Sequence, residues 1–238
     1  MTNIIIFGAS RGLGAGLAEG VPQVGDTVWL VSRGRPRQLE AADGITRHWL
    51  QVDLAQETAA DEIGRALGNT PLDVLIYNAG IWENSAFSSR YQFEAVTAAE
   101  NQRILTVNLL SAVHCLHALV PNVRQSASGK IILIGSTSGL ENVRAPEVAY
   151  NASKFGLRGV AHALRENLRA DHVAVTCLNP GSLNTSTPLA AGAEAAGRAQ
   201  PDCIPLADMV AIVRCLIQLS PYTCVKEMDI PAMLDVHV

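Results

Sequence analysis

Short apolar runs alternate along the chain with longer stretches whose apolar positions have helical spacing. The short runs are rich in β-branched residues and several end at Gly, Asp or Asn, as is typical of buried strands. They predict strands at residues 4–7, 27–31, 48–52, 73–77, 130–134, 173–178 and 225–230. The stretches between them predict helices at residues 13–21, 35–42, 56–67, 98–119, 148–169 and 206–219.

This alternation predicts an α/β fold with a parallel sheet of six to seven strands and helices on both faces. No linker or internal repeat divides residues 1–238, so we expect one doubly wound, Rossmann-type domain. Residues 182–205 begin with many small side chains and follow the sixth strand. Their place beyond the carboxyl end of that strand predicts a mobile substrate lid rather than a linker.

Composition narrows the class of partner. The chain is 48% hydrophobic and 17% charged, which is enough to build a sizeable core. A net charge of −4 without a basic block argues against nucleic acid and membrane partners. The five cysteines contain no C-x-x-C pair, which is typical of reduced thiols. The first apolar run is too short for a signal peptide, and no other run approaches membrane length, so we expect a cytoplasmic protein.

Residues 8–14, with the sequence GASRGLG, join the first strand to the first helix. Glycines permit a tight turn and a close approach of the backbone to a pyrophosphate, and a helix N-terminus adds N–H donors. The spacing is G-x-x-x-G-x-G, which differs from the G-x-G-x-x-G of other dinucleotide folds. A simple strand-to-helix turn is the alternative, but the position in the first βα unit favours a cofactor site.

The second strand ends in cations where an NAD site usually carries an acidic residue. Arg33 follows Ser32, and Arg35 and Arg37 come just beyond. A guanidinium can bind a ribose 2′-phosphate through a fork of donors, which predicts NADP(H) as the cofactor. The alternative is that these arginines are solvated surface residues.

Tyr150 and Lys154 form a Y-x-x-x-K pair on one face of the predicted helix 148–169. A free tyrosine has a pKa of about 10, and a neighbouring ammonium is expected to lower it. The pair alone also occurs by chance. Ser136 follows the fifth strand, so both Ser136 and Tyr150 fall at the carboxyl edge of the sheet, where open α/β folds bind ligands. Asn108 lies within a predicted helix, where asparagine has a low helix propensity. Its presence there favours a functional role, and a surface position is the alternative.

In their order and spacing across residues 4–185, these motifs resemble the short-chain dehydrogenase/reductase family. The glycine turn is similar to that family's T-G-x-x-x-G-x-G, with Phe7 in place of the threonine. Residues 77–80 resemble its N-N-A-G, with Tyr77 in place of the first asparagine. Residues 180–185 resemble its P-G-x-hydrophobic-x-T segment.

The resemblance implies a role for each residue of the site. Tyr150 would be the general acid/base, with Lys154 lowering its pKa and Ser136 bonding the substrate oxygen. Asn108 would hold a water linked to the lysine, and Thr137 and Ser138 remain alternatives to Ser136. Asp53 would lie near the adenine, or instead cap the next helix. The implied NADP(H) contacts are Gly8, Ser10, Arg11, Gly12, Leu13, Gly14, Arg33, Asp53, Leu54, Asn78, Ala79, Gly80, Tyr150, Lys154, Pro180, Gly181, Leu183 and Thr185.

The implied activity is hydride transfer between NADP(H) and the carbonyl or secondary alcohol of a small molecule, by a homodimer or homotetramer. A non-catalytic NADP(H)-sensing or scaffold protein on the same fold is the alternative. We expect no metal, because His114 and His117 have no third ligand. The substrate class stays open, with pocket walls expected from residues 140–147, the lid and the aromatic residues Trp82, Phe87, Tyr91 and Phe93, which could equally pack a long loop.

Overall fold

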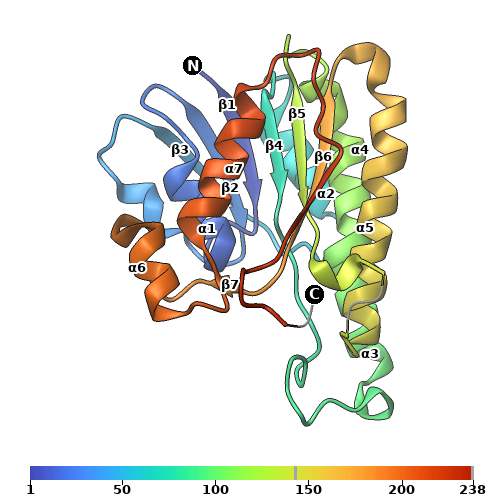
Figure 1. The fold of residues 1–238 in the computed structure, drawn as a ribbon. Coiled ribbons are helices and arrows are strands. Elements are labelled where there is room, and N and C mark those ends of the chain that lie inside the picture. Colours follow the sequence, from blue (N-terminus) through green and yellow to red (C-terminus); the bar gives the residue numbers. More distant parts are fainter. Residues whose placement is uncertain (142–143, 237–238) are drawn as a thin grey trace.

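A computed structural model describes residues 1–141 and 144–236. A parallel sheet of seven strands, in the order β3-β2-β1-β4-β5-β6-β9, runs through its centre (Figure 1). This order confirms the doubly wound α/β class, because the chain moves outward from β1 first to one side and then to the other. The strands are β1 (Asn3–Phe7), β2 (Thr27–Ser32), β3 (Thr46–Gln51), β4 (Val74–Tyr77), β5 (Lys130–Ile134), β6 (Ala174–Pro180) and β9 (Glu227–Ile230).

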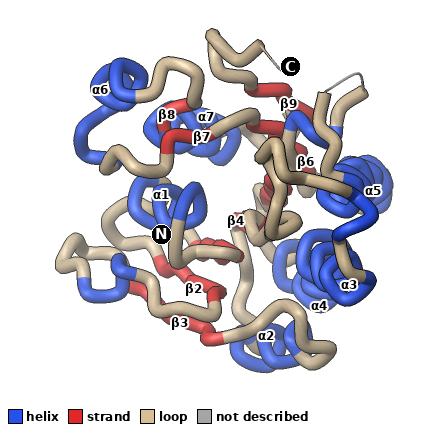
Figure 2. The backbone as a smooth tube through the Cα atoms, turned by 90° about the horizontal axis from the view of Figure 1, so that it is seen from below, coloured by secondary structure: helices blue, strands red, loops and turns tan. Residues whose placement is uncertain are grey.

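Helices cover both faces of the sheet (Figure 2). The period-two alternation of a strand decides which face each side chain joins. The helices are α1 (Gly12–Gly20), α2 (Ala59–Leu67), α3 (Ala98–Leu105), α4 (Ser111–Val123), α5 (Val148–Asn167), α6 (Gly192–Ala199) and α7 (Leu206–Gln218). In β1, Ile5 and Phe7 pack in the core shared with α2, α4 and α5, whereas Ile4 and Ile6 pack in the core shared with α1 and α7.

Several predicted elements differ from the structure at their ends or in type. The predicted helix 35–42 is only a 3₁₀ turn, Arg37–Glu40, and the predicted helix 98–119 is not α-helical throughout. A π-helical turn, η3 (Thr106–Leu110), separates α3 from α4, and α4 extends to Val123. The apolar pattern gives no sign of this turn, because apolar residues with helical spacing continue through it.

The helical stretch Ala98–Val123 is long and apolar enough to cross a membrane, which the sequence analysis did not expect. Half of its most apolar window is buried inside the protein. Leu116 and Leu119 of this stretch pack in the core beneath the sheet. The burial is that of a core helix, which passes the same length and composition test.

The predicted lid, residues 182–205, folds into two short parallel strands and α6. The strands are β7 (Leu183–Asn184) and β8 (Ile204–Pro205). Asn184 is fully buried and ties the segment together, since its amide donates to the Ala196 carbonyl and to Thr187 Oγ1, both at 3.0 Å. A buried, fully bonded asparagine stabilises a defined shape, so this segment is not a plain linker.

The predicted site residues come together because parallel strands end at one edge of the sheet, at the bottom of Figure 1. Gly8 follows β1, Arg33 follows β2, Asn78 follows β4, Ser136 follows β5 and Gly181 follows β6. The loop from residue 81 to residue 97 extends from this same edge and leads into α3.

Candidate active site

The turn after β1 is shaped by close backbone contacts. Gly8 has φ +73° and donates its N–H to the Val31 carbonyl at 2.8 Å. A Cβ added at Gly14 would lie 2.0 Å from the Gly8 carbonyl oxygen and 2.6 Å from Asn78 Nδ2. Glycine is therefore required at both positions, and their contacts bring together the ends of β1, β2 and β4.

The N-terminus of α1 is open to an anion. Arg11 occupies the N-cap position and makes no side-chain bond to the first turn, whose N–H groups have no partner within the helix. Gly12 has φ +54°, and a Cβ built there would meet only Thr185 Cγ2, at 3.8 Å. The turn thus faces Thr185 in the segment 180–185, and within the turn Ser10 is half-buried and Leu13 is buried. Such a cradle fits a pyrophosphate.

Two arginines at the end of β2 and in the glycine turn lack carboxylate partners. Arg11 and Arg33 are exposed, and in the described chain neither forms a salt bridge or a side-chain hydrogen bond. Arg35, by contrast, pairs with Glu40 at 3.1 Å. The first two guanidiniums are therefore free to bind a phosphate.

Asp53 and Leu54 follow β3. The Asp53 carboxylate accepts the Ala55 N–H at 3.1 Å, and Leu54 is buried. The next helix, α2, begins only at Ala59 and has Thr58 at its N-cap position. Asp53 therefore shapes a local turn and is not the cap of that helix, which was one of the two roles considered for it.

Tyr150 and Ser136 meet at the start of α5. Both are buried, and the Ser136 hydroxyl lies near enough to that of Tyr150 to act on its pKa, which it lowers. Ser136 Oγ also accepts the Ser138 N–H at 3.1 Å. Among the described residues, neither Thr137 nor Ser138 has such an effect on Tyr150. The structure thus favours Ser136 over its two neighbours.

The pKa of Tyr150 is raised, which is opposite to the expected direction. Burial is the main cause, the buried carboxylates Glu147 and Glu83 add to it, and the hydrogen bond with Ser136 opposes it. The sequence pointed to the nearby ammonium and carried no sign of the burial or of the two carboxylates. In the protein as described, Tyr150 therefore retains its proton at neutral pH.

Lys154 lies behind the Tyr150 ring. Its Nζ is 5.5 Å from the ring centroid and donates to the Ile134 carbonyl at 3.0 Å. Burial lowers the pKa of Lys154 to about 8. A Cβ added at Gly80 would lie 3.5 Å from this Nζ, so residues 78–80 pass close to the ammonium.

Asn108 lies in the π-helical turn and is buried. Its Oδ1 accepts the Ile81 N–H at 2.8 Å, and its Nδ2 donates to the Ile81 carbonyl at 2.8 Å and to Ser153 Oγ at 3.0 Å. The surface alternative is therefore wrong. Asn108 instead joins three segments: the β4 loop, the π turn and α5.

Tyr77, which departs from the family pattern, holds the π turn in place. Its ring is buried, and its hydroxyl donates to the Val107 carbonyl at 2.9 Å and lies 2.5 Å from Ser111 Oγ. A π-helical turn leaves carbonyl groups that need partners, and Tyr77 supplies one. Tyr77 thereby joins the end of β4 to the π turn and to the start of α4.

Residues 180–185 complete this edge. Pro180 ends β6, and Gly181 donates its N–H to the Ile230 carbonyl at 2.9 Å. Leu183 is half-buried in β7, and Thr185 is exposed opposite Gly12. Residues 142 and 143, part of the predicted pocket segment 140–147, lie outside the described residues.

Glu83 is a site residue that sequence reasoning missed. Its side chain is fully buried, and Oε1 accepts the N–H groups of Ala149 at 3.0 Å and Tyr150 at 3.3 Å. The N-cap residue of α5, Glu147, makes no side-chain cap bond. The sequence carried one signal for this role. No Ser, Thr, Asp or Asn directly precedes the helix, so its first N–H groups need an acceptor from another part of the chain.

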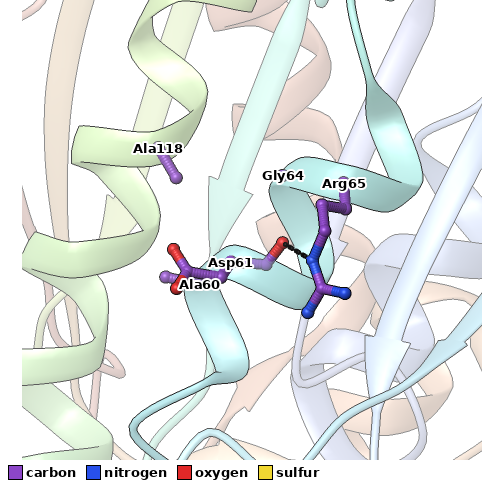
Figure 3. Close-up of a pocket in the computed structure, with 5 residues that line it drawn as sticks. All are labelled: Ala60, Asp61, Gly64, Arg65 and Ala118. Carbon is purple, nitrogen blue, oxygen red and sulfur yellow. Dashed lines mark hydrogen bonds between the residues drawn. The ribbon is translucent and has the colours of Figure 1, made fainter.

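An open hollow of about 490 Å³ lies between α2 and α4 (Figure 3). Ala60, Asp61 and Arg65 line it, and Arg65 Nε donates to the Asp61 carbonyl at 3.2 Å. Gly64 faces Ala118 there, as small residues do where helices pack closely. No predicted site residue lines this hollow, so it lies apart from the candidate active site.

His114 and His117 lie exposed on α4. Within residues 1–141 and 144–236, no group of three or more His, Cys, Asp or Glu side chains is placed to hold a metal ion. The two histidines take no part in the site described above.

Relatives of known sequence point to one family. The sequence model for short chain dehydrogenase matches residues 2–195. The 3-oxoacyl-(acyl-carrier-protein) reductase FabG of Aggregatibacter actinomycetemcomitans is 32% identical, with 76% of each chain covered. D-xylose 1-dehydrogenase of Caulobacter vibrioides is 30% identical, covering 76% of this chain and 72% of the relative.

Solved structures share the fold. L-sorbose reductase from Gluconobacter frateurii, complexed with NADPH and L-sorbose, has a TM-score of 0.80 at 20% identity and covers 100% of this chain and 97% of that one. The Pseudomonas aeruginosa RhlG/NADP complex has a TM-score of 0.77 at 23% identity, with coverage of 99% and 96%. The matched sequence model and the 32% identical relative establish that the chain belongs to the short-chain dehydrogenase family.

Proposed function

We propose that this chain is an NADP(H)-dependent oxidoreductase that reduces the carbonyl of a small molecule to a secondary alcohol, with Tyr150 as general acid. The observation that carries the proposal is the buried Tyr150, which lies beside Ser136 and Lys154 at the sheet edge that also holds the glycine turn. Structural neighbours solved with NADPH or NADP support the choice of cofactor.

The residues present fit such a cofactor. The open space beside Gly12 and the open first turn of α1 suit the pyrophosphate. Arg11 and Arg33 would bind the 2′-phosphate, Asp53 and Leu54 would lie beside the adenine, and residues 78–80 would pass along the ribose. Pro180, Gly181, Leu183 and Thr185 would hold the nicotinamide end. When bound, NADPH supplies the hydride.

The protein's own part is to hold and move a proton. The raised pKa of Tyr150 keeps its hydroxyl protonated, as a general acid requires, and Ser136 would donate a second hydrogen bond to the carbonyl oxygen. Lys154 would bind the ribose hydroxyls as an ammonium. Asn108 would hold a water only through the second lone pair of Oδ1, because its other groups are bonded to Ile81 and Ser153.

The predicted lid and the oligomer belong to this proposal. Residues 182–205 would close over the substrate by moving as one folded piece around Asn184. A homodimer or homotetramer would cover the exposed apolar side chains Leu110 and Val113 near α4 and Phe155 on α5. A monomer mass in light scattering would refute that assembly.

The central test is the Tyr150→Phe variant. Removing the hydroxyl should lower the turnover of a reducible carbonyl by at least about 100-fold, the usual scale of general acid catalysis, while NADPH binding changes little. Tyr222→Phe, at an exposed tyrosine, is the control and should behave as wild type. Full turnover in Tyr150→Phe would disprove the role. NADPH binding without turnover of any carbonyl by the wild type would favour the sensor alternative.

A further inference from the structure

Two exposed aromatic rings stand against the buried Tyr150 ring. The Phe87 and Trp82 centroids lie 5.6 and 6.3 Å from that of Tyr150, with interplanar angles of 88° and 89°. They also contact each other at 5.7 Å. Trp82 is 53% exposed and Phe87 is 59% exposed. The pair, here called the aromatic wall, presents apolar surface to solvent beside the proposed catalytic hydroxyl.

One of these rings is held on a strained backbone. Phe87 has φ +57°, in the left-handed region, which bulky residues rarely adopt because the Cβ crowds the backbone. Its N–H donates at 2.7 Å to Oε1 of Glu147, which is itself buried. A glycine or asparagine would take this conformation more readily. Strain at such a position points to a use for the ring.

Charge beside the wall disfavours anions. Glu83 and Glu147 are 0% and 2% exposed, and in the described residues each has a second carboxylate oxygen, Oε2, without a hydrogen-bond partner. Both carboxylates act against the phenolate of Tyr150. Lys154, the buried cation nearby, is engaged with the Ile134 carbonyl behind the ring. An anionic substituent at the wall would meet uncompensated negative charge.

We propose that the aromatic wall of Trp82 and Phe87 makes this site selective for neutral carbonyl compounds that carry a planar aromatic ring next to the carbonyl. The ring of the substrate would add a further edge-to-face or offset contact to the wall, while the carbonyl oxygen reaches Tyr150 and Ser136. Saturated rings lack the planar face, and carboxylates are repelled by Glu83 and Glu147. This inference rests on the proposed carbonyl reduction.

The test compares two methyl ketones and one α-keto acid of similar size, with the rate of NADPH oxidation as the readout. Acetophenone is neutral and planar, cyclohexyl methyl ketone is neutral and saturated, and phenylglyoxylate is planar and anionic. Acetophenone should exceed cyclohexyl methyl ketone about tenfold in kcat/KM, the scale of two aromatic contacts. It should exceed phenylglyoxylate about 100-fold, because like charges placed together are strongly unfavourable.

Substitutions at Trp82 and Phe87 test whether the aromatic wall causes the preference for acetophenone. Trp82→Leu and Phe87→Leu should each bring the acetophenone to cyclohexyl methyl ketone ratio to within about threefold of one, since each removes one ring contact. Phe93→Leu is the matched control: Phe93 is 49% exposed on the same loop and, in the described structure, makes no ring contact with Tyr150. The control should keep the wild-type ratio.

Each outcome decides between the two proposals. Wild-type turnover without a preference for the planar neutral ketone, or a preference that survives both wall variants, would overturn the selectivity and leave carbonyl reduction standing. Failure to turn over all three ketones and propanal would overturn the proposed function and the selectivity with it.

Discussion

The glycine turn and the start of α5 lie at the same edge of the sheet, yet they are built in different ways. In the turn, backbone atoms touch, as where a Cβ at Gly14 would come within 2.0 Å of the Gly8 carbonyl six residues earlier. At α5, side chains reach across long separations. Glu83 accepts the N–H of Tyr150, 67 residues later, and Glu147 accepts the N–H of Phe87 from 60 residues earlier.

This difference predicts that the two regions respond differently to amino-acid substitutions. The turn should tolerate no added volume, because its neighbours are backbone atoms that cannot move aside. The start of α5 should tolerate changes of volume better than loss of a buried hydrogen-bond partner, because N–H groups would be left unpaired. Four measurements test this contrast.

The largest effect is expected at the turn. Gly14→Ala forces the Gly8 carbonyl to shift, so we expect a loss of about 3 kcal/mol in the free energy of unfolding and weak NADPH binding. Gly159→Ala on the exposed face of α5, where a Cβ meets nothing within 4 Å, should instead stabilise the protein by about 1 kcal/mol. Urea unfolding of both variants measures the contrast. Equal effects would remove the distinction between the two regions.

The next effect is expected at the remote cap. Glu83→Ala leaves the N–H groups of Ala149 and Tyr150 without their acceptor, which should cost about 2 kcal/mol in the free energy of unfolding. Glu83→Gln retains an acceptor oxygen and should lose less. Glu194→Gln, on the exposed surface of α6, serves as the control. If Glu83→Ala unfolds at the wild-type urea concentration, the capping role is wrong.

A smaller effect is expected at the π turn. Tyr77→Phe removes one donor to the Val107 carbonyl, but Ser111 Oγ still donates to that carbonyl at 2.8 Å. We therefore expect a loss of about 1 kcal/mol in stability. Tyr222→Phe, at an exposed hydroxyl, should change stability by almost nothing. A Tyr77→Phe protein as stable as Tyr222→Phe would show that the π turn forms without this bond.

The smallest effect concerns pH. Because burial lowers the pKa of Lys154 to about 8, its ammonium is present below that pH and is lost above it, whereas Tyr150 keeps its proton. The rate of NADPH-dependent reduction should be level up to about pH 7 and fall to half near pH 8. Circular dichroism at each pH checks that the chain stays folded. A rate that increases between pH 7 and 9 would contradict this assignment.

The local pattern of apolar residues was sufficient to predict most strands of the sheet, and the motifs were sufficient to suggest the family. The runs at residues 4–7, 73–77 and 130–134 carry their own strand signal, and the spacing of the motifs led to the short-chain dehydrogenase resemblance that the comparisons confirm. The π turn at Thr106–Leu110 carries no such signal. Its stability depends on Tyr77, which lies about 30 residues away and joins it only in the folded chain.

The direction of the Tyr150 pKa shift shows the same limit. The sequence places a cation one helical turn away, and that neighbour alone would favour the phenolate. The fold buries the hydroxyl and brings Glu83 and Glu147 beside it, and these effects dominate. Spacing along one helix cannot show which side chains arrive from other segments.

The sequence by itself determined the alternation of strands and helices and the need for glycine in the turn. It also identified Ser136, Tyr150 and Lys154 as site candidates. Each of these features depends on residues that lie close together in the chain. Only the tertiary structure decided that Glu83 caps α5, that Asn108 joins three segments and that the Trp82 and Phe87 rings contact the Tyr150 ring. The physical reason is that burial and long-range hydrogen bonds come into being only when distant segments pack together.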